Sequence, residues 1–247
     1  MTEAPSLSPL PHKGAGALLT VRNLQAWYGE SHILHGMNFD VHAGEVVTLL
    51  GRNGAGKTTT LKSVMGMIAR RSGSVRFNDQ EIITATSDRI ARRGIAICPE
   101  ERGIFSSLTV RENLLLPPVV RPGGMSLDAI HALFPNLKER RNSVGTKLSG
   151  GEQQMLAIGR ILRTGATLLM LDEPTEGLAP VIIEQIGDTI AQLKKEGFTI
   201  LLVEQNFRFA ATVADRYYVV EHGRIIDSFA NTELSANTDK LHSYLGV

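Results

Sequence analysis

The fold of this chain is decided by Val46-Val47-Thr48-Leu49-Leu50 and the residues that follow it, Gly51-Arg52-Asn53-Gly54-Ala55-Gly56-Lys57-Thr58. The first five residues form a nearly continuous apolar run, which is typical of a parallel strand buried on both faces. The next eight fit G-x-x-x-x-G-K-[ST], in which glycines let successive backbone N–H groups turn inward around phosphate oxygens. Apolar residues then recur at helical spacing, at Leu61, Val64, Met65 and Ile68. The stretch predicts a strand, a phosphate-binding loop and a helix whose N-terminus holds a nucleoside triphosphate.

Two side chains of the loop carry most of its chemistry. Lys57 can bring a positive charge to the β- and γ-phosphates, and the Thr58 hydroxyl can hold Mg²⁺. The alternative is a glycine-rich turn without a ligand, but strand, loop, Lys-Thr pair and helix coincide here. We therefore expect nucleotide contacts from Gly51, Arg52, Asn53, Gly54, Ala55, Gly56, Lys57, Thr58 and Thr59.

Composition bounds the class of protein. With 247 residues and 43% hydrophobic residues, the chain is long enough for one large α/β domain. The formal net charge of +1 gives no electrostatic case for binding nucleic acid. Cys98 is the only cysteine, so no internal disulfide can form. No window has the roughly 18 to 20 apolar residues of a membrane helix, and residues 1–17, rich in proline, read as a poorly ordered tail and not as a signal peptide.

Strands and helices alternate along the rest of the chain. Strands are expected at 18–28, 94–98, 168–171 and 200–203, with hairpins over 74–83 and 217–229, and helices at 111–116, 127–133 and 181–195. This order predicts a mostly parallel sheet covered on both faces. We expect a single domain over residues 18–247, with a smaller helical subdomain at about 101–160.

Two carboxylates end the expected strand at 168–171. Asp172 and Glu173 follow it directly, at the sheet edge where open α/β proteins place their ligands. Asp172 can hold Mg²⁺, and Glu173 is positioned to polarise a water for attack on the γ-phosphate. A pair of solvated acids that only marks the strand end is the alternative.

The run Leu148-Ser149-Gly150-Gly151-Glu152-Gln153-Gln154 is a third motif. Ser149 and Glu152 form a capping box that opens an apolar helix, and this alone is an ordinary structural role. The two glycines add exposed N–H groups and permit close approach by a ligand. We expect Ser149, Gly150, Gly151 and Gln153 to form a second anion-binding surface.

Together, these three motifs resemble the hallmarks of ATP-binding cassette ATPases, over about residues 18–247. The resemblance implies a P-loop NTPase (RecA-like) α/β core with a mostly parallel sheet, an antiparallel β portion and a helical subdomain. It also implies that two cassettes pair head to tail, so that the L-S-G-G-E-Q run of one chain closes over the γ-phosphate held by the other. Tyr28 matches the aromatic residue that stacks on adenine. Because Trp27 and Tyr28 face opposite sides of a strand, only one of them can do so.

Two positions depart from the general family pattern. Glu100 stands where most cassettes have a Gln that touches Mg²⁺ and the attacking water, and Gln205 stands where most have a His that contacts the γ-phosphate. Gln can donate a hydrogen bond to phosphate but cannot gain a proton near neutral pH. We therefore expect the catalytic group to comprise Glu173, Gln205 and Glu100, and the metal to bind Thr58, Asp172 and Glu100. In a heterodimer, this site should turn over more slowly than the partner's.

Two further stretches resemble a particular group within this family. E-P-T-E-G-L-A-P (173–180) and L-V-E-Q-N (202–206) are similar to the corresponding stretches of one ATPase subunit of bacterial branched-chain amino-acid uptake transporters. Urea-uptake ATPases have almost the same motifs and remain an alternative. The resemblance implies a second ATPase subunit or a homodimer, membrane permeases contacted through residues 101–118, an indirect periplasmic solute-binding protein, and a place at the cytoplasmic face of the inner membrane. A soluble repair or translation cassette would need coiled coils or a second cassette, and a small-molecule kinase leaves residues 148–154 unexplained.

Overall fold

The computed structural model describes residues 16–246 and builds them around a six-stranded sheet in the order β10-β9-β3-β8-β7-β6. All neighbouring strands are parallel except the β9–β10 hairpin. The strands are β3 (Val46–Leu50), β6 (Ile95–Cys98), β7 (Leu168–Asp172), β8 (Thr199–Glu204), β9 (Arg216–Glu221) and β10 (Arg224–Ala230). The sheet confirms the expected α/β fold, and it brings the carboxyl ends of β3, β6, β7 and β8 to one edge.

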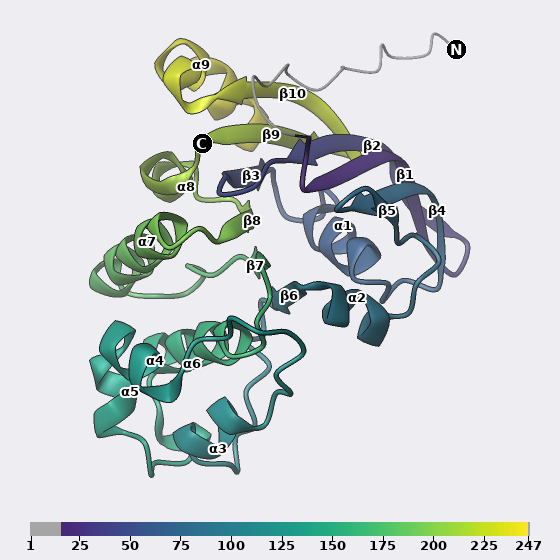
Figure 1. The fold of residues 1–247 in the computed structure, drawn as a ribbon. Coiled ribbons are helices and arrows are strands. Elements are labelled where there is room, and N and C mark those ends of the chain that lie inside the picture. Colours follow the sequence, from purple (N-terminus) through teal and green to yellow (C-terminus); the bar gives the residue numbers. More distant parts are fainter. Residues whose placement is uncertain (1–15, 247) are drawn as a thin grey trace, which may run out of the picture.

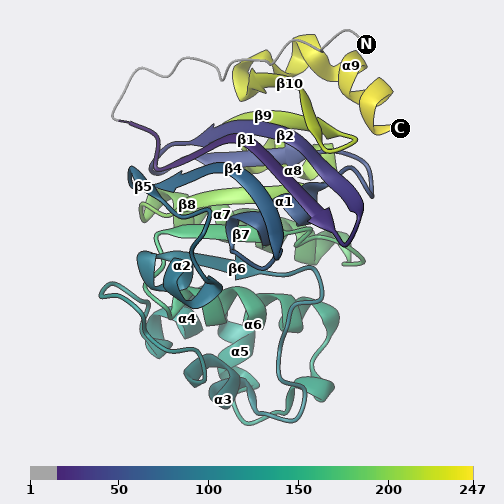
Figure 2. The same ribbon diagram turned by 90° about the vertical axis from the view of Figure 1, so that its right-hand side faces the viewer.

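A second, antiparallel sheet has the order β2-β1-β4-β5 and lies over α1 (Lys57–Val64), as Figure 2 shows. Its strands are β1 (Leu19–Tyr28), β2 (Ser31–Val41), β4 (Arg70–Phe77) and β5 (Gln80–Glu81). β2 is not among the strands that the sequence analysis predicts, because polar residues and Gly36, with φ of 95°, interrupt its alternation. The expected hairpin over 74–83 is present as β4 and β5.

The remaining helices lie against the parallel sheet or beyond its β6 edge (Figure 1). They are α2 (Ser87–Arg93), α3 (Val110–Leu115), α4 (Leu127–Leu133), α5 (Pro135–Glu139), α6 (Gly150–Leu162), α7 (Pro180–Lys195), α8 (Phe207–Val213) and α9 (Leu234–Leu245), with 3₁₀ turns at Gly145–Lys147 and Asn231–Glu233. α1 ends at Val64, so Met65 and Ile68 lie beyond the helix, although both are buried. No helix of residues 16–246 is long and apolar enough to cross a bilayer.

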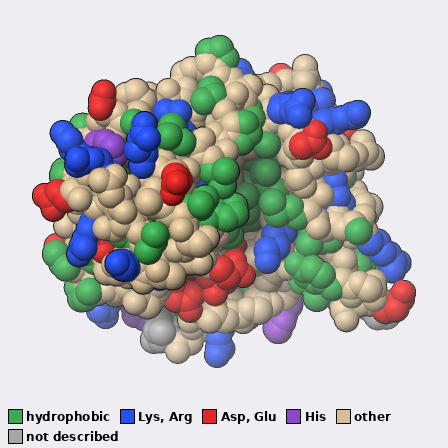
Figure 3. All heavy atoms as spheres, turned by 90° about the horizontal axis from the view of Figure 1, so that it is seen from below, with side chains coloured by type: hydrophobic (Ala, Val, Ile, Leu, Met, Phe, Trp, Pro, Cys, Tyr) green, Lys and Arg blue, Asp and Glu red, His purple; other side chains and the backbone are tan. Residues whose placement is uncertain are grey.

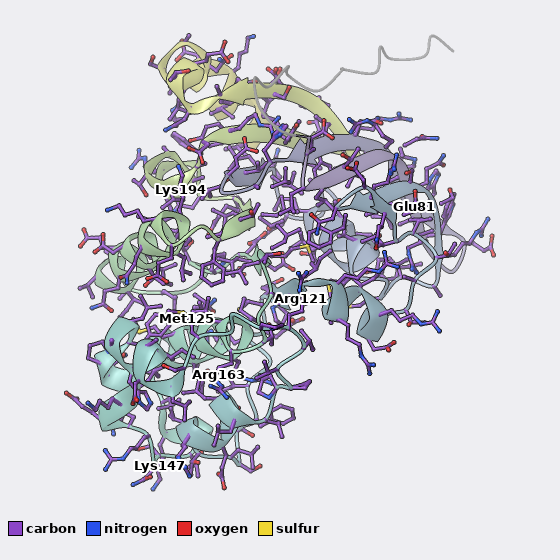
Figure 4. All side chains as sticks on the ribbon, in the orientation of Figure 1. Glu81, Arg121, Met125, Lys147, Arg163 and Lys194 are labelled. Carbon is purple, nitrogen blue, oxygen red and sulfur yellow. The ribbon has the colours of Figure 1, made fainter. Side chains whose placement is uncertain are left out.

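The helices α3 to α6 lie together at the lower end of Figure 1, below the strand β6. The loop between α3 and α4 is tied to the core on both sides: the Arg121 guanidinium donates to the carbonyl of Arg93 at the end of α2, and the Arg163 guanidinium donates to the carbonyl of Met125 (3.2 Å). Figure 4 labels Arg121, Met125 and Arg163 in this region. This loop is therefore anchored to the ends of α2 and α6.

Two large apolar clusters hold the layers together. One lies between the antiparallel sheet, α1 and one face of the parallel sheet, and the other joins the opposite face to α3, α6 and α7. Strand β3 contributes to both, with Leu49 in the first and Val46 in the second. This burial on both faces fixes the strand that carries the glycine-rich loop. The expected tail at 1–17 lies outside the described residues except for Gly16 and Ala17, which precede β1.

Candidate nucleotide-binding site

The glycine-rich loop joins β3 to α1 as the sequence predicts. A Cβ atom at Gly51 would collide with the carbonyl oxygen of Val220 on β9, so only glycine fits there. Gly54 and Gly56 have φ of 80° and 106°, in the left-handed region that favours glycine. Gly56 is the N-cap of α1 and supplies no side-chain cap, so the first N–H groups of the helix are available to an anion.

A cavity of about 370 Å³ opens beside this loop. It is lined by the ends of β1, β6 and β7, the start of β2, and the loop with the first turn of α1: Tyr28, Ile33, Asn53, Gly54, Gly56, Lys57, Thr58, Thr59, Glu100 and Glu173. Glycine-rich loop and strand-end carboxylate thus face one space, although they are far apart in the chain. Gly51, Arg52 and Ala55 shape the loop without lining the cavity.

The two adjacent aromatic residues of β1 have different surroundings. Trp27 stacks on His32, with ring centroids 4.3 Å apart, and the Arg70 guanidinium lies over its ring. Tyr28 lines the cavity and is 48% exposed. Of the two, Tyr28 has the ring that is open to a ligand.

Lys57 is buried and held by three oxygen atoms. Its ammonium donates to the carbonyls of Gly51 (2.8 Å) and Arg52 (3.1 Å), and it forms an ion pair with Oε1 of Glu173 (2.9 Å). Burial of an ammonium requires such partners, because an unpaired charge in the interior is costly. The residue expected to bind phosphate is therefore paired with the residue expected to activate water.

Thr58 and Asp172 form the oxygen-rich part of the site. The Thr58 hydroxyl donates to Oδ1 of Asp172 at 3.0 Å. Burial raises the pKa of Asp172 to about 6; the hydrogen bond from Thr58 opposes this rise, and the carboxylates of Glu173 and Glu100 add to it. A carboxylate next to a hydroxyl is a suitable pair of hard oxygen ligands for Mg²⁺. Residues 16–246 contain no cluster of three or more His, Cys, Asp or Glu arranged for a metal.

The other carboxylates make this edge of the sheet strongly acidic. Burial raises the pKa of Glu100, and the carboxylates of Glu176, Glu173 and Glu101 raise it further. Figure 3, which views the molecule from below, shows acidic side chains gathered beside a hollow with hydrophobic walls. Such an arrangement favours a cation at the site and disfavours an unaccompanied polyphosphate.

The run at 148–154 forms the N-terminus of α6. The Ser149 hydroxyl accepts from the amide of Glu152 (3.2 Å), and the Glu152 carboxylate accepts from the amide of Ser149 (2.7 Å), which is the predicted capping box. Gln153 bonds to Arg102 and to the carbonyls of Gly145 and Leu148. Ser149, Gly150, Gly151 and Gln153 lie outside the cavity, so a single chain does not bring the two expected anion-binding surfaces together.

Gln205 follows β8, is half-buried and lies outside the cavity lining. Its neighbour Glu204, which the sequence analysis gives no role, is 2% exposed. Burial raises the pKa of Glu204 to about 7, against the lowering effect of its hydrogen bonds from Thr175 and Asn206. Ile33 was also missed, because the strand that carries it was not predicted. No local sequence signal marks Glu204, which follows the apolar run at 200–203 and precedes two further polar residues.

Known proteins share this architecture. Residues 34–176 match the family model for the ABC transporter. The chain is 44% identical, over 93% of its length and 100% of the relative's, to the high-affinity branched-chain amino acid transport ATP-binding protein BraG of Pseudomonas aeruginosa. It is 37% identical, over 88% of its length and 94% of the relative's, to the probable branched-chain amino acid transport ATP-binding protein LivF of Archaeoglobus fulgidus. A crystal structure of a nucleotide-free ATP-binding cassette from an ABC transporter superposes with a TM-score of 0.81 at 24% identity, covering 94% of this chain and 99% of that one. The chain belongs to the ATP-binding subunits of the ABC transporter family.

Proposed function

We propose that this chain is the ATP-binding and ATP-hydrolysing subunit of an importer for branched-chain or other hydrophobic amino acids. The observation that carries the proposal is the meeting of Lys57, Thr58 and Glu173 at one cavity in a chain 44% identical to BraG over nearly its whole length. The cavity supports ATP binding, which all members of the family share, and does not indicate the transported substrate. The amino-acid substrate rests on BraG and LivF, which are both named for that transport.

ATP would bind with its adenine on Tyr28 and its phosphates in the loop from Gly51 to Thr59. Tyr28 offers an exposed ring and lines the same cavity as the loop residues Gly54 and Gly56 and the first residues of α1. Thr58, Asp172 and Glu100 would hold Mg²⁺, which when bound neutralises charge on the phosphates.

Glu173 is the proposed general base that polarises the attacking water. It lines the cavity directly, and its carboxylate is paired with Lys57. Transfer of Lys57 to the phosphates would release the Glu173 carboxylate to orient water. Gln205 would donate a hydrogen bond to phosphate, and Glu100 would take part in positioning the water. A Gln at that position supplies no titrating imidazole, which supports a slower site than one with His.

A second cassette would complete the site. Ser149, Gly150, Gly151 and Gln153 lie outside the cavity of their own chain, so their backbone N–H groups would serve a nucleotide held by a partner, either another ATPase subunit or a second copy. Closure of the pair around ATP would then depend on both chains.

Membrane permeases are the proposed partners that turn closure into transport. Several large apolar side chains of the segment between β6 and α4 are exposed: Phe105, Leu115, Leu116 and Val119. Exposed apolar side chains of this size support a protein interface in this segment. Docking there would place the chain at the cytoplasmic face of the membrane, with a periplasmic binding protein involved only indirectly.

The test is uptake of labelled leucine, isoleucine and valine by cells with and without the gene for this chain, with complementation by wild type and by Glu173→Gln. The proposal predicts loss of uptake that only the wild type restores. Normal uptake of these amino acids in the deletion strain would overturn the substrate assignment, and loss of urea uptake instead would support the urea alternative.

A further inference from the structure

Glu204 is a buried carboxylate at the centre of the acidic sheet edge. It is the last residue of β8, between β3 and β7, and it is 2% exposed. A carboxylate at this depth is costly unless hydrogen bonds satisfy it. Glu204 does not line the nucleotide cavity, so contact with ATP does not account for its presence.

The Glu204 carboxylate joins two loops. Its Oε1 accepts from the Thr175 hydroxyl at 2.8 Å, and its Oε2 accepts from the backbone amide of Asn206 at 3.2 Å. Thr175 lies two residues after Glu173, and Asn206 directly follows Gln205. One buried group thus connects the segments that carry both side chains facing the γ-phosphate in the proposed reaction.

The backbone of Glu173 needs such support. Its φ is 45°, in the left-handed region that non-glycine residues rarely adopt. Its amide donates to the carbonyl of Val203 (3.0 Å), the residue before Glu204. A strained conformation of this kind persists only where the surrounding structure enforces it. Two contacts from β8 hold this conformation of Glu173: the Val203 carbonyl accepts from the Glu173 amide, and the Glu204 carboxylate accepts from the Thr175 hydroxyl.

We propose that Glu204 is a positioning residue for ATP hydrolysis, which acts through the Thr175 hydroxyl and the Asn206 amide to hold Glu173 and Gln205 in their productive places. The inference deepens the proposed function and rests on it. It assigns the pair Glu204–Thr175 a role in the rate of hydrolysis and none in the affinity for ATP, because neither side chain lines the cavity.

The test measures kcat and KM for ATP with the full chain assembled with its partner subunits, for wild type, Thr175→Val, Thr175→Ser and Glu204→Gln. Thr175→Val removes the hydroxyl with little change in volume, and Thr175→Ser keeps it. Glu204→Gln removes the negative charge, so the contacts with the Thr175 hydroxyl and the Asn206 amide are no longer charge-assisted. The matched control is Thr189→Val: Thr189 on α7 is 6% exposed, Thr175 is 5% exposed, and each hydroxyl donates one hydrogen bond at 2.8 Å.

We expect Thr175→Val and Glu204→Gln to lower kcat about three- to tenfold with KM within twofold of wild type. Thr175→Ser should restore kcat, and Thr189→Val should leave it unchanged. The double variant Thr175→Val/Glu204→Gln should lose less than the product of the two single losses, because both changes weaken the bond between Glu204 and Thr175. Wild-type kcat in Thr175→Val, or equal losses in Thr175→Val and Thr189→Val, would overturn the proposal. Absence of hydrolysis by the wild-type complex would instead contradict the proposed function.

Discussion

The ion pair between Lys57 and Glu173 predicts that Glu173 competes with the phosphates of ATP for Lys57, and that Glu173→Gln binds ATP more tightly. In the structure the Lys57 ammonium is 2.9 Å from Oε1 of Glu173. To reach the phosphates it must give up this partner, and the freed carboxylate then repels the γ-phosphate. A glutamine keeps an acceptor for Lys57 but carries no charge, so it holds the ammonium less strongly.

The size of the effect follows from the geometry. At 2.9 Å and an effective dielectric constant of about 20, the gross Coulomb attraction is roughly 6 kcal/mol, most of which is offset by desolvation of the two groups. The net difference between a charge-assisted and a neutral hydrogen bond is about 1–2 kcal/mol. This corresponds to roughly a 5- to 30-fold gain in affinity for Glu173→Gln.

The assay is calorimetric titration with Mg²⁺ and a non-hydrolysable ATP analogue, so that hydrolysis does not bias the comparison. Glu176→Gln is the matched control, since Glu176 is an exposed carboxylate near Glu100 in the same segment but forms no ion pair with Lys57. We expect it to change affinity less than twofold. The reasoning is refuted if Glu173→Gln binds the analogue no tighter than wild type, or if Glu176→Gln tightens binding equally.

Four further predictions concern single residues. Lys57→Ala should weaken ATP binding at least tenfold, because a charge-assisted contact of about 1.5–3 kcal/mol is lost; unchanged affinity in a titration would remove Lys57 from the site. Tyr28→Ala should weaken binding of both ATP and ADP by about 1–3 kcal/mol, as measured by fluorescence of a labelled nucleotide. An affinity of the variant equal to that of the wild type would exclude adenine stacking on Tyr28. Phe105→Asp should stop transport while ATP affinity is kept, and loss of the folded state by circular dichroism would show that Phe105 packs the core instead. For Glu204, whose pKa burial raises to about 7, the protonated form stabilises the fold. The free energy of unfolding of the ligand-free chain should therefore fall by about 1–3 kcal/mol between pH 5 and pH 8, and Glu204→Gln should flatten that fall in urea denaturation; a stability that rises with pH would contradict this.

The parts of the fold that the sequence predicts are those with local, repeated signals. α4 spans Leu127–Leu133 as expected, and the capping box of Ser149 and Glu152 opens α6. Each depends on residues within a few positions of one another. β2 escaped prediction because Gly36 and its polar neighbours hide the alternation, while pairing with β1 along its whole length forms the strand nonetheless.

The site likewise has parts that the sequence predicts and parts that it does not. The loop from Gly51 to Thr59 can be predicted because its residues are contiguous in the sequence. The pairing of Lys57 with Glu173, by contrast, depends on how β3 and β7 are ordered in the sheet, with β8 between them. Glu204 resembles an ordinary polar residue at a strand end, and only the fold shows that it is buried against Thr175. Contacts between distant strand ends are therefore the information that the sequence alone does not provide.

The most direct measurement for the central claim is leucine uptake into proteoliposomes that contain the complete transporter, with ATP supplied on the side of this chain. The account predicts accumulation that requires ATP hydrolysis and falls to background when this chain carries Glu173→Gln, although ATP remains bound. Wild-type uptake by the Glu173→Gln complex, with the second ATPase subunit unchanged, would contradict it.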